Sequence, residues 1–199
     1  MRSIAARVVA VLGTLAAALC LSACTDRPAP APDHHADQTT SADNHNADDV
    51  MFAQNMIPHH EQALELAAMV PTNTANADLF VVAKHITADQ QPEIRLLTGW
   101  LQQWGEDVPG NGGHSGHGGM AIDGMVDPAT MDKLKSLKGA EFDTLWVQSM
   151  IGHHQGAITM AEAEIAHGQS PDAISLAKLM VTEQRNDIAT MNRLTGMTQ

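Results

Sequence analysis

The sequence predicts an all-α protein: a four-helix bundle made of two duplicated helical hairpins, joined by a flexible crossover rich in Gly and His. Apolar residues recur at helical spacing over long segments. The motif Met56-Ile57-Pro58-His59-His60 returns 94 residues later as Met150-Ile151-Gly152-His153-His154. The composition agrees, because a chain with 12 Met, few aromatics and no Tyr favours Met-filled helical packing over a β-sandwich.

The first 23 residues have the pattern of a secretory signal. Arg2 and Arg7 precede a short apolar run over residues 8–19, and Leu21-Ser22-Ala23-Cys24 follows, which has the form of a bacterial lipobox. We therefore expect cleavage before Cys24 and lipidation of its thiol. The mature protein would then be anchored by lipid on the extracytoplasmic face of a membrane in the bacterial cell envelope.

Residues 24–48 are expected to form a disordered tether. They are rich in Pro, Ala, Asp, Asn and Thr and show no apolar periodicity. The histidines of this segment are expected to be solvated: His34, His35 and His45.

The charge and cysteine content of the mature chain exclude several functions. Nine Lys and Arg remain against 23 Asp and Glu, a net charge of about −14. Nucleic acid is therefore not an expected partner, whereas cations are attracted. Cys24 is the only cysteine left, so neither a disulfide framework nor a thiolate metal site is available.

Both histidines of the first motif fall on an apolar helical face. The first helix is expected over residues 49–69, and its seam is Phe52, Met56, His59, Ala63, Leu66 and Val70. His60 lies in a second apolar stripe beside it. Pro58 and its counterpart Gly152 are both poor helix formers, which predicts a kink or a helix start just before each histidine pair.

The remaining elements follow from the same periodicity. A turn over 71–76 leads to a second helix over 77–104, a short helix is expected over 128–138, and the last two long helices cover 140–167 and the region after Pro171. The glycine-rich crossover carries a His/Met-rich loop, residues 110–125. That loop is either an auxiliary metal site or a plain linker.

The duplication places further polar residues on the inward face. The halves, about 49–104 and 140–197 of a domain covering 49–199, align without a gap, so that Gln90 matches Gln184 and Glu93 matches Asp187. The resulting inward set is His59, His60, His153, His154, Gln90, Gln184, Glu93 and Asp187, with Met56 and Met150 one turn away. Each unpartnered polar group in a core costs about 1–3 kcal/mol, so these groups must bind one another, water or a metal.

Two readings of this set stay open, and we favour a metal. One is a metal-free polar network in a structural or partner-binding bundle. The other is a metal site, favoured because two histidine pairs occupy equivalent places, each matched to an acid and a Gln. Imidazole suits copper, zinc, iron and nickel, whereas the thioethers of Met56 and Met150 point to copper, particularly Cu(I).

Redox enzymes of the di-iron type fit the sequence less well. Their bundles use Glu-x-x-His motifs, but here Gln90 stands three residues before Glu93 and Gln184 three before Asp187. No phosphate-binding loop or nucleophile elbow is present. A metal-dependent oxidase is thus the weaker alternative, and we expect a binding protein rather than an enzyme.

The paired motifs resemble those of a known family, the domain of unknown function 305 family. The resemblance rests on residues 52–63 with their echo at 146–157, and on Gln90-Gln91-Pro92-Glu93-Ile94 with its echo at 184–188. It covers about residues 49–197 and implies a ferritin-like four-helix bundle in secreted or envelope proteins, some of them associated with copper. The metal residues it implies are Met56, His59, His60, Met150, His153 and His154. Asp187 departs from the family's usual Glu, which predicts unequal halves.

Together these observations predict an extracytoplasmic metal-binding lipoprotein. The metal ion is expected to be copper, bound for sequestration, buffering or delivery. Whether the halves share one site or make two is left open by the sequence.

Overall fold

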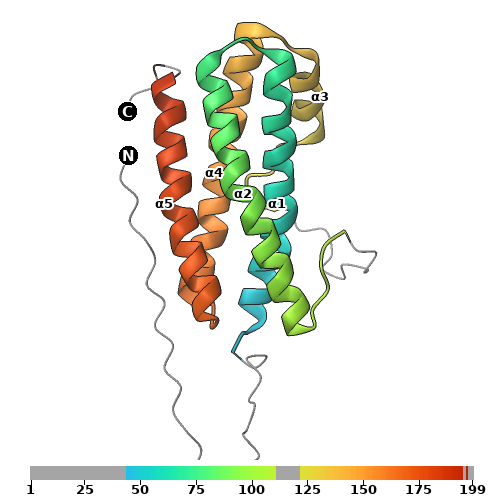
Figure 1. Ribbon diagram of the computed structural model, residues 1–199, viewed down its shortest axis with the longest axis vertical. Coiled ribbons are helices and arrows are strands. Elements are labelled where there is room, and N and C mark those ends of the chain that lie inside the picture. The colour runs from blue at the N-terminus through green and yellow to red at the C-terminus, as the bar shows by residue number, and fades with distance from the viewer. Residues whose placement is uncertain (1–43, 111–121, 195, 197–199) are drawn as a thin grey trace, which may run out of the picture. The chain divides into compact units, whose positions relative to one another are not determined.

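A computed structural model describes residues 44–110, 122–194 and 196, all within one unit of the chain that covers residues 39–199. This part contains five α-helices and no strand (Figure 1). The helices are α1 Ala47–Asn73, α2 Ala77–Trp104, α3 Pro128–Ser136, α4 Gly139–His167 and α5 Pro171–Leu194. The predicted all-α fold, with two long helical hairpins, is confirmed.

The bundle is assembled from the hairpins α1–α2 and α4–α5. Figure 1 shows their four long helices running along one another. Within each hairpin the helices pack extensively, and α1 packs against α4, whereas α2 and α5 make only a few contacts. The short helix α3 lies against α1 and α4. None of the helices in the described residues combines the length and apolar character needed to cross a membrane.

Some predictions fall on residues that the structure does not describe. These are the signal peptide, the lipidation site Cys24, His34 and His35, and most of the His/Met-rich loop, residues 111–121. They stay predictions.

Several helix ends differ from the sequence-based expectation. Asn46 caps α1 in a reciprocal arrangement with Asp49, so the helix begins two residues earlier than expected. Helix α1 then continues through Pro58 and through Pro71 to Asn73, and α4 continues through Gly152. Of the two predicted alternatives, a kink or a helix start at each histidine pair, the helix start is therefore wrong, and so is the turn at residue 71, because burial on the bundle side outweighs the local helix weakness.

The two halves hold each other by equivalent contacts at opposite corners. Asp49 of α1 accepts a hydrogen bond of 2.8 Å from the backbone N–H of Ser170, between α4 and α5. Asp143 of α4 accepts one of 3.0 Å from the Asn76 side chain, between α1 and α2. Since 49 and 143, like 76 and 170, are 94 residues apart, the contacts are related by the predicted pseudo-two-fold symmetry.

A polar layer divides the core of the bundle into two apolar clusters. One cluster gathers Leu66, Ile86, Phe142, Trp146 and Met150, among others. The other gathers Phe52, Met56, Leu97, Ala157 and Met180, among others. On each long helix, the predicted polar residues fall between the stretches that enter the two clusters. The polar set therefore lies at mid-height of the bundle, with apolar packing on both sides.

Candidate metal centre

Four histidines form the centre of the polar layer. Helix α1 supplies His59 and His60, and helix α4 supplies His153 and His154; each is at most 1% exposed. Adjacent residues lie about 100° apart around a helix, so one histidine of each pair faces the other hairpin and its neighbour faces its own partner helix. This layer confirms the inward placement that the apolar periodicity predicts.

The inner histidines meet across the contact between α1 and α4. The ring centroids of His59 and His153 are 3.7 Å apart, with the ring planes tilted by 32°. Within each pair the ring centroids are 6.3 Å apart, on α1 as on α4. The two halves thus contribute to one continuous group of four rings.

The outer histidines each contact an acid on the partner helix of their own hairpin. His60 Nε2 lies 2.7 Å from Glu93 Oε2, and His154 Nε2 lies 3.3 Å from Asp187 Oδ2. The second contact is longer, as expected for a side chain one methylene shorter. The two halves are therefore unequal at this point.

Many polar atoms of the layer have no hydrogen-bond partner among the described residues. These atoms are both ring nitrogens of His59 and of His153, Nδ1 of His60 and of His154, and Oε1 of Gln90 and of Gln184. The backbone of Asp123 lies near His59 and slightly favours its charged form, but its geometry falls short of a hydrogen bond. Native proteins rarely leave so many buried polar atoms without a ligand or water.

Burial keeps the imidazoles of His59, His60 and His153 neutral. It lowers the pKa of His59 to about 3, helped by repulsion from His60 and His154, and it lowers the pKa of His60 to about 3. Burial, followed by repulsion from His59, His154 and His60, lowers the pKa of His153 to about 2, although the backbone of His59 acts in the opposite direction. Because a neutral imidazole carries a free lone pair, these rings suit metal binding without a proton to displace. Burial, followed by repulsion from Asp89, raises the pKa of Glu93 to about 7.

The segment 122–126 covers the inner histidines from one side. The Gln62 side chain donates to the carbonyl of Val126 (2.9 Å) and accepts from its N–H (2.7 Å). Gly124, with φ of 79°, lies against Gly156 of α4, and a Cβ on Gly156 would collide with the Asp123 carbonyl. Only glycine allows the backbones to approach this closely.

Sequence reasoning missed the residues that hold this segment. Gln62 and Gly156 are counterparts at the 94-residue offset, yet they differ in type. The difference between Gln62 and Gly156, inside an otherwise matched motif, is the sequence signal that could have revealed these residues. It marks the place where a segment outside the repeat packs on the bundle.

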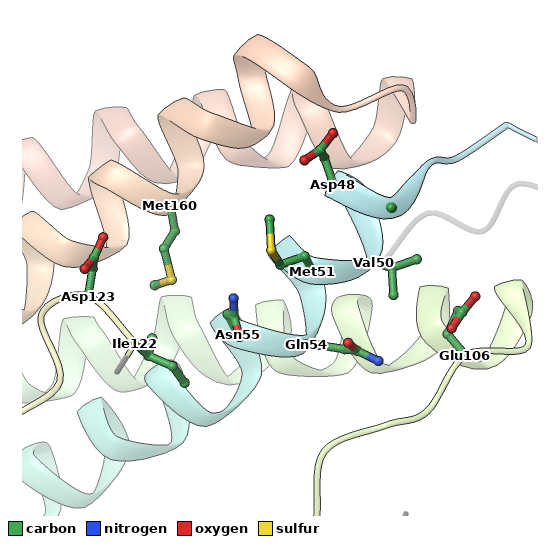
Figure 2. A pocket seen from close by; sticks show the side chains of 10 residues that line it. Asp48, Val50, Met51, Gln54, Asn55, Glu106, Ile122, Asp123 and Met160 are labelled. Carbon is green, nitrogen blue, oxygen red and sulfur yellow. The ribbon is translucent and has the colours of Figure 1, made fainter. Parts of the chain in front are cut away.

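A pocket of about 630 Å³ lies beyond Asp123, on the flank of α1 and α4. Figure 2 shows Met51 and Asn55 of α1 and Met160 of α4 around this space, together with Asp123. The predicted thioether ligands lie elsewhere: Met56 and Met150 are fully buried, each in a different apolar cluster beside the histidine layer.

The histidine nitrogens of the layer are chemically suitable ligands for a metal ion, but the side chains do not form a preorganised coordination site. Among the described residues, no group of three or more His, Cys, Asp or Glu is placed to hold a metal ion as it stands. The unpartnered nitrogens of His59, His153 and their neighbours nevertheless are donors of a kind that copper accepts. A metal ion held by these nitrogens would require the rings to rotate within the layer.

Fold and site together define a class: a duplicated four-helix bundle with a buried layer of histidines. The family model of DUF305, a domain of unknown function, matches residues 49–195. The chain therefore belongs to the DUF305 family.

Solved structures of the same fold include family members and metal-bound proteins. A DUF305 protein from Streptomyces coelicolor is 29% identical with a TM-score of 0.67, covering 74% of this chain and 91% of its own. A DUF305 fragment from Deinococcus radiodurans is 28% identical with a TM-score of 0.67, covering 77% and 98%. CopM in its Cu(I)-bound form is 28% identical with a TM-score of 0.60, covering 73% and 94%. Comparison with curated proteins finds no match.

Proposed function

We propose that this protein binds copper in the bacterial cell envelope, for sequestration, buffering or delivery. One observation carries the proposal: the facing rings of His59 and His153 are buried and neutral, and none of their four nitrogens has a partner among the described residues. Such a pair costs stability in the metal-free protein. A metal ion that binds both rings removes that cost.

Copper is favoured over other metals by the donors and by the relatives. Neutral imidazole and thioether together suit Cu(I) better than Zn(II) or Fe(II). CopM, of similar fold, is known in Cu(I)-bound, Cu(II)-bound and Ag-bound forms. Silver is a common mimic of Cu(I), which is consistent with a soft-metal centre in CopM.

We propose one shared centre rather than one in each half. His59 and His153 would be its inner ligands, because they already meet at the contact between α1 and α4. His60 and His154 each keep a free Nδ1, so that a rotated ring adds a further ligand. Met56 and Met150, Gln90 and Gln184 would complete the surroundings, while Glu93 and Asp187 orient the outer rings.

The proposed location follows from the N-terminal sequence. A lipid on Cys24 and a tether over residues 24–48 would place the bundle outside the membrane, where copper enters the cell. The Streptomyces coelicolor relative, which is assigned as secreted, supports an extracytoplasmic site. The excess of acidic residues suits a cation-binding protein.

A structural role for the layer is the second candidate, favoured by one observation. The hydrogen bonds from His60 to Glu93 and from His154 to Asp187 link the helices of each hairpin. In that case the layer would set helix register, and the inner histidines would stabilise the bundle.

The double variant His59→Leu/His153→Leu separates the two candidates. The copper proposal predicts that the metal-free variant melts at a higher temperature than the wild type, because two unpartnered polar groups are removed. It also predicts that Cu(I) and Ag(I) raise the melting temperature of the wild type but not of the variant. The matched control is the exposed His167→Ala, which should behave as the wild type. A variant that melts lower, with an unchanged metal response, would favour the structural role.

A further inference from the structure

One exposed histidine stands next to the buried layer, and neither the duplicated motif nor the proposed centre includes it. His85 of α2 has a side chain that is 55% exposed. Its Nδ1 lies 3.2 Å from Asp89 Oδ2, and its Nε2 lies 3.5 Å from Asp187 Oδ1. The ring is therefore placed between solvent and the seam of α2 with α5.

Asp187 connects this exposed ring to a buried one. One carboxylate oxygen faces His85, and the other lies 3.3 Å from Nε2 of His154, which is 0% exposed. Gln184, one turn earlier on α5, is 4% exposed and its Oε1 has no partner among the described residues. An uninterrupted row of metal-binding side chains thus runs from the surface to the histidine layer.

The packing around the histidine layer favours entry of a cation between α2 and α5 over entry from the opposite side of the bundle. The α2 and α5 helices make few contacts with each other. On the other side, the segment 122–126 lies on α4 so closely that neither Gly124 nor Gly156 has room for a Cβ. A cation moving through the α2–α5 seam has to displace side chains only, whereas the opposite side is closed by backbone.

The row exists in one half of the repeat only. The counterpart of His85 is Leu179, which is 51% exposed. The counterpart of Asp89 is Glu183, and the counterpart of Asp187 is Glu93, so the second half keeps the acids but lacks the histidine. Leu179 is therefore a matched control position for substitutions of His85.

We propose that His85, Asp89 and Asp187 form the route by which a cation reaches the buried histidines. This inference rests on the proposed function and adds an access path to it. Imidazole with carboxylate is a good ligand set for Cu(II), and acids grouped around an exposed histidine attract cations from solution. The ion exchanges ligands in sequence, from His85 with Asp89, to Asp187, to His154, and no electron is transferred.

The test measures binding rate and equilibrium affinity separately. Cu(II) is mixed rapidly with the full-length protein, and the quenching of tryptophan fluorescence is followed over time. In His85→Ala we expect association and dissociation rate constants that fall together by about tenfold or more, with unchanged stoichiometry and dissociation constant. Leu179→Ala and His167→Ala are the controls and should keep the wild-type rates.

A rescue variant makes the test stricter. By the pseudo-symmetry, a histidine at position 179 would stand beside Glu93 as His85 stands beside Asp187. Leu179→His in the His85→Ala background should therefore restore fast association. Unchanged rates in His85→Ala would overturn the route while leaving copper binding intact. A lower affinity for Cu(II) at an unchanged association rate would also overturn the route, because it would make His85 a ligand of the bound metal. A wild-type protein that saturably binds neither Cu(II) nor Cu(I) would instead overturn the proposed function.

Discussion

At the scale of residues, the layer shows how burial selects one chemical form of a side chain. The same desolvation that makes His59 and His153 neutral also makes their unpartnered nitrogens costly. Asp187 and Glu93 show that a single methylene changes the contact to the outer ring from 2.7 to 3.3 Å. Residue type at equivalent positions therefore decides how similar the two halves are.

Another buried carboxyl, that of Glu164, leads to a testable prediction. Glu164 is 1% exposed and lies against Asp49, whose own carboxylate binds the backbone of Ser170. Burial, followed by the contact with Asp49, raises the pKa of Glu164 to about 8. Folded Glu164 is therefore protonated at neutral pH, and its O–H can donate to Asp49.

We expect Glu164→Gln to change how stability depends on pH. In the wild type the raised pKa means that the folded state binds the extra proton, so stability is lost as pH rises from about 4.5 to about 8. Gln mimics the protonated acid, so the variant should gain stability over the wild type steadily across that range. Urea unfolding at several pH values measures this, with Glu61→Gln on the exposed face of α1 as the control. A constant difference between variant and wild type at every pH would contradict the assignment.

At the scale of elements, helix α4 carries two glycines with opposite roles. A Cβ on Gly152 meets nothing within 4 Å, whereas one on Gly156 would collide with the backbone of Asp123 and Gly124. Both replacements by Ala improve helix propensity by about 0.5–1 kcal/mol. Only the second has to displace the segment that covers the inner histidines.

We therefore expect the two alanine substitutions to change the free energy of unfolding in opposite directions. Gly152→Ala should raise the free energy of unfolding, and Gly156→Ala should lower it. In Gly156→Ala the amide of Val126, which donates to Gln62, should also lose protection from hydrogen exchange. Chemical denaturation and hydrogen exchange measure both effects. Equal stabilisation by the two variants would show that the segment 122–126 does not pack on α4 as described.

The elements also show which parts of the fold the sequence can predict. The seam through Phe52, His59 and Leu66 follows from periodicity, because it depends only on residues within the helix. The extension of α1 through Pro71 to Asn73 could not be predicted, since packing from the other hairpin outweighs a local defect. The cover over the site depends on a contact between Gly156 of α4 and Gly124, which lies outside the repeat. His85 was missed because its partner Asp187 lies in the other half.

At the scale of the whole molecule, the duplication turns local polar residues into a shared centre. Each hairpin brings a histidine pair, an acid and a Gln, but the inner rings meet only when the halves associate. The contacts of Asp49 with Ser170 and of Asp143 with Asn76 hold the halves in this register. The centre is thus a property of the complete bundle.

The ionisable groups of the bundle predict a maximum in the stability of the metal-free protein. The pKa values of His59, His60 and His153 are lowered from 6.5 to about 2–3, so the folded state binds fewer protons and stability is lost as pH falls below about 6.5. The pKa values of Glu93 and Glu164 are raised to about 7 and about 8, so stability is lost as pH rises towards those values. These opposite slopes place the maximum at about pH 6. Thermal unfolding across pH checks it, and a steady rise in stability from pH 6 to 8 would contradict it.

Nuclear magnetic resonance of the histidine side chains tests whether a metal ion is held between His59 and His153. Long-range proton–nitrogen spectra of ¹⁵N-labelled protein report each ring nitrogen, and single His variants assign the signals. On adding one equivalent of Ag(I) or Cu(I), we predict that the ring nitrogens of both His59 and His153 shift together and that those of His167 do not. Shifts confined to exposed histidines, with the two inner rings unchanged, would contradict the account.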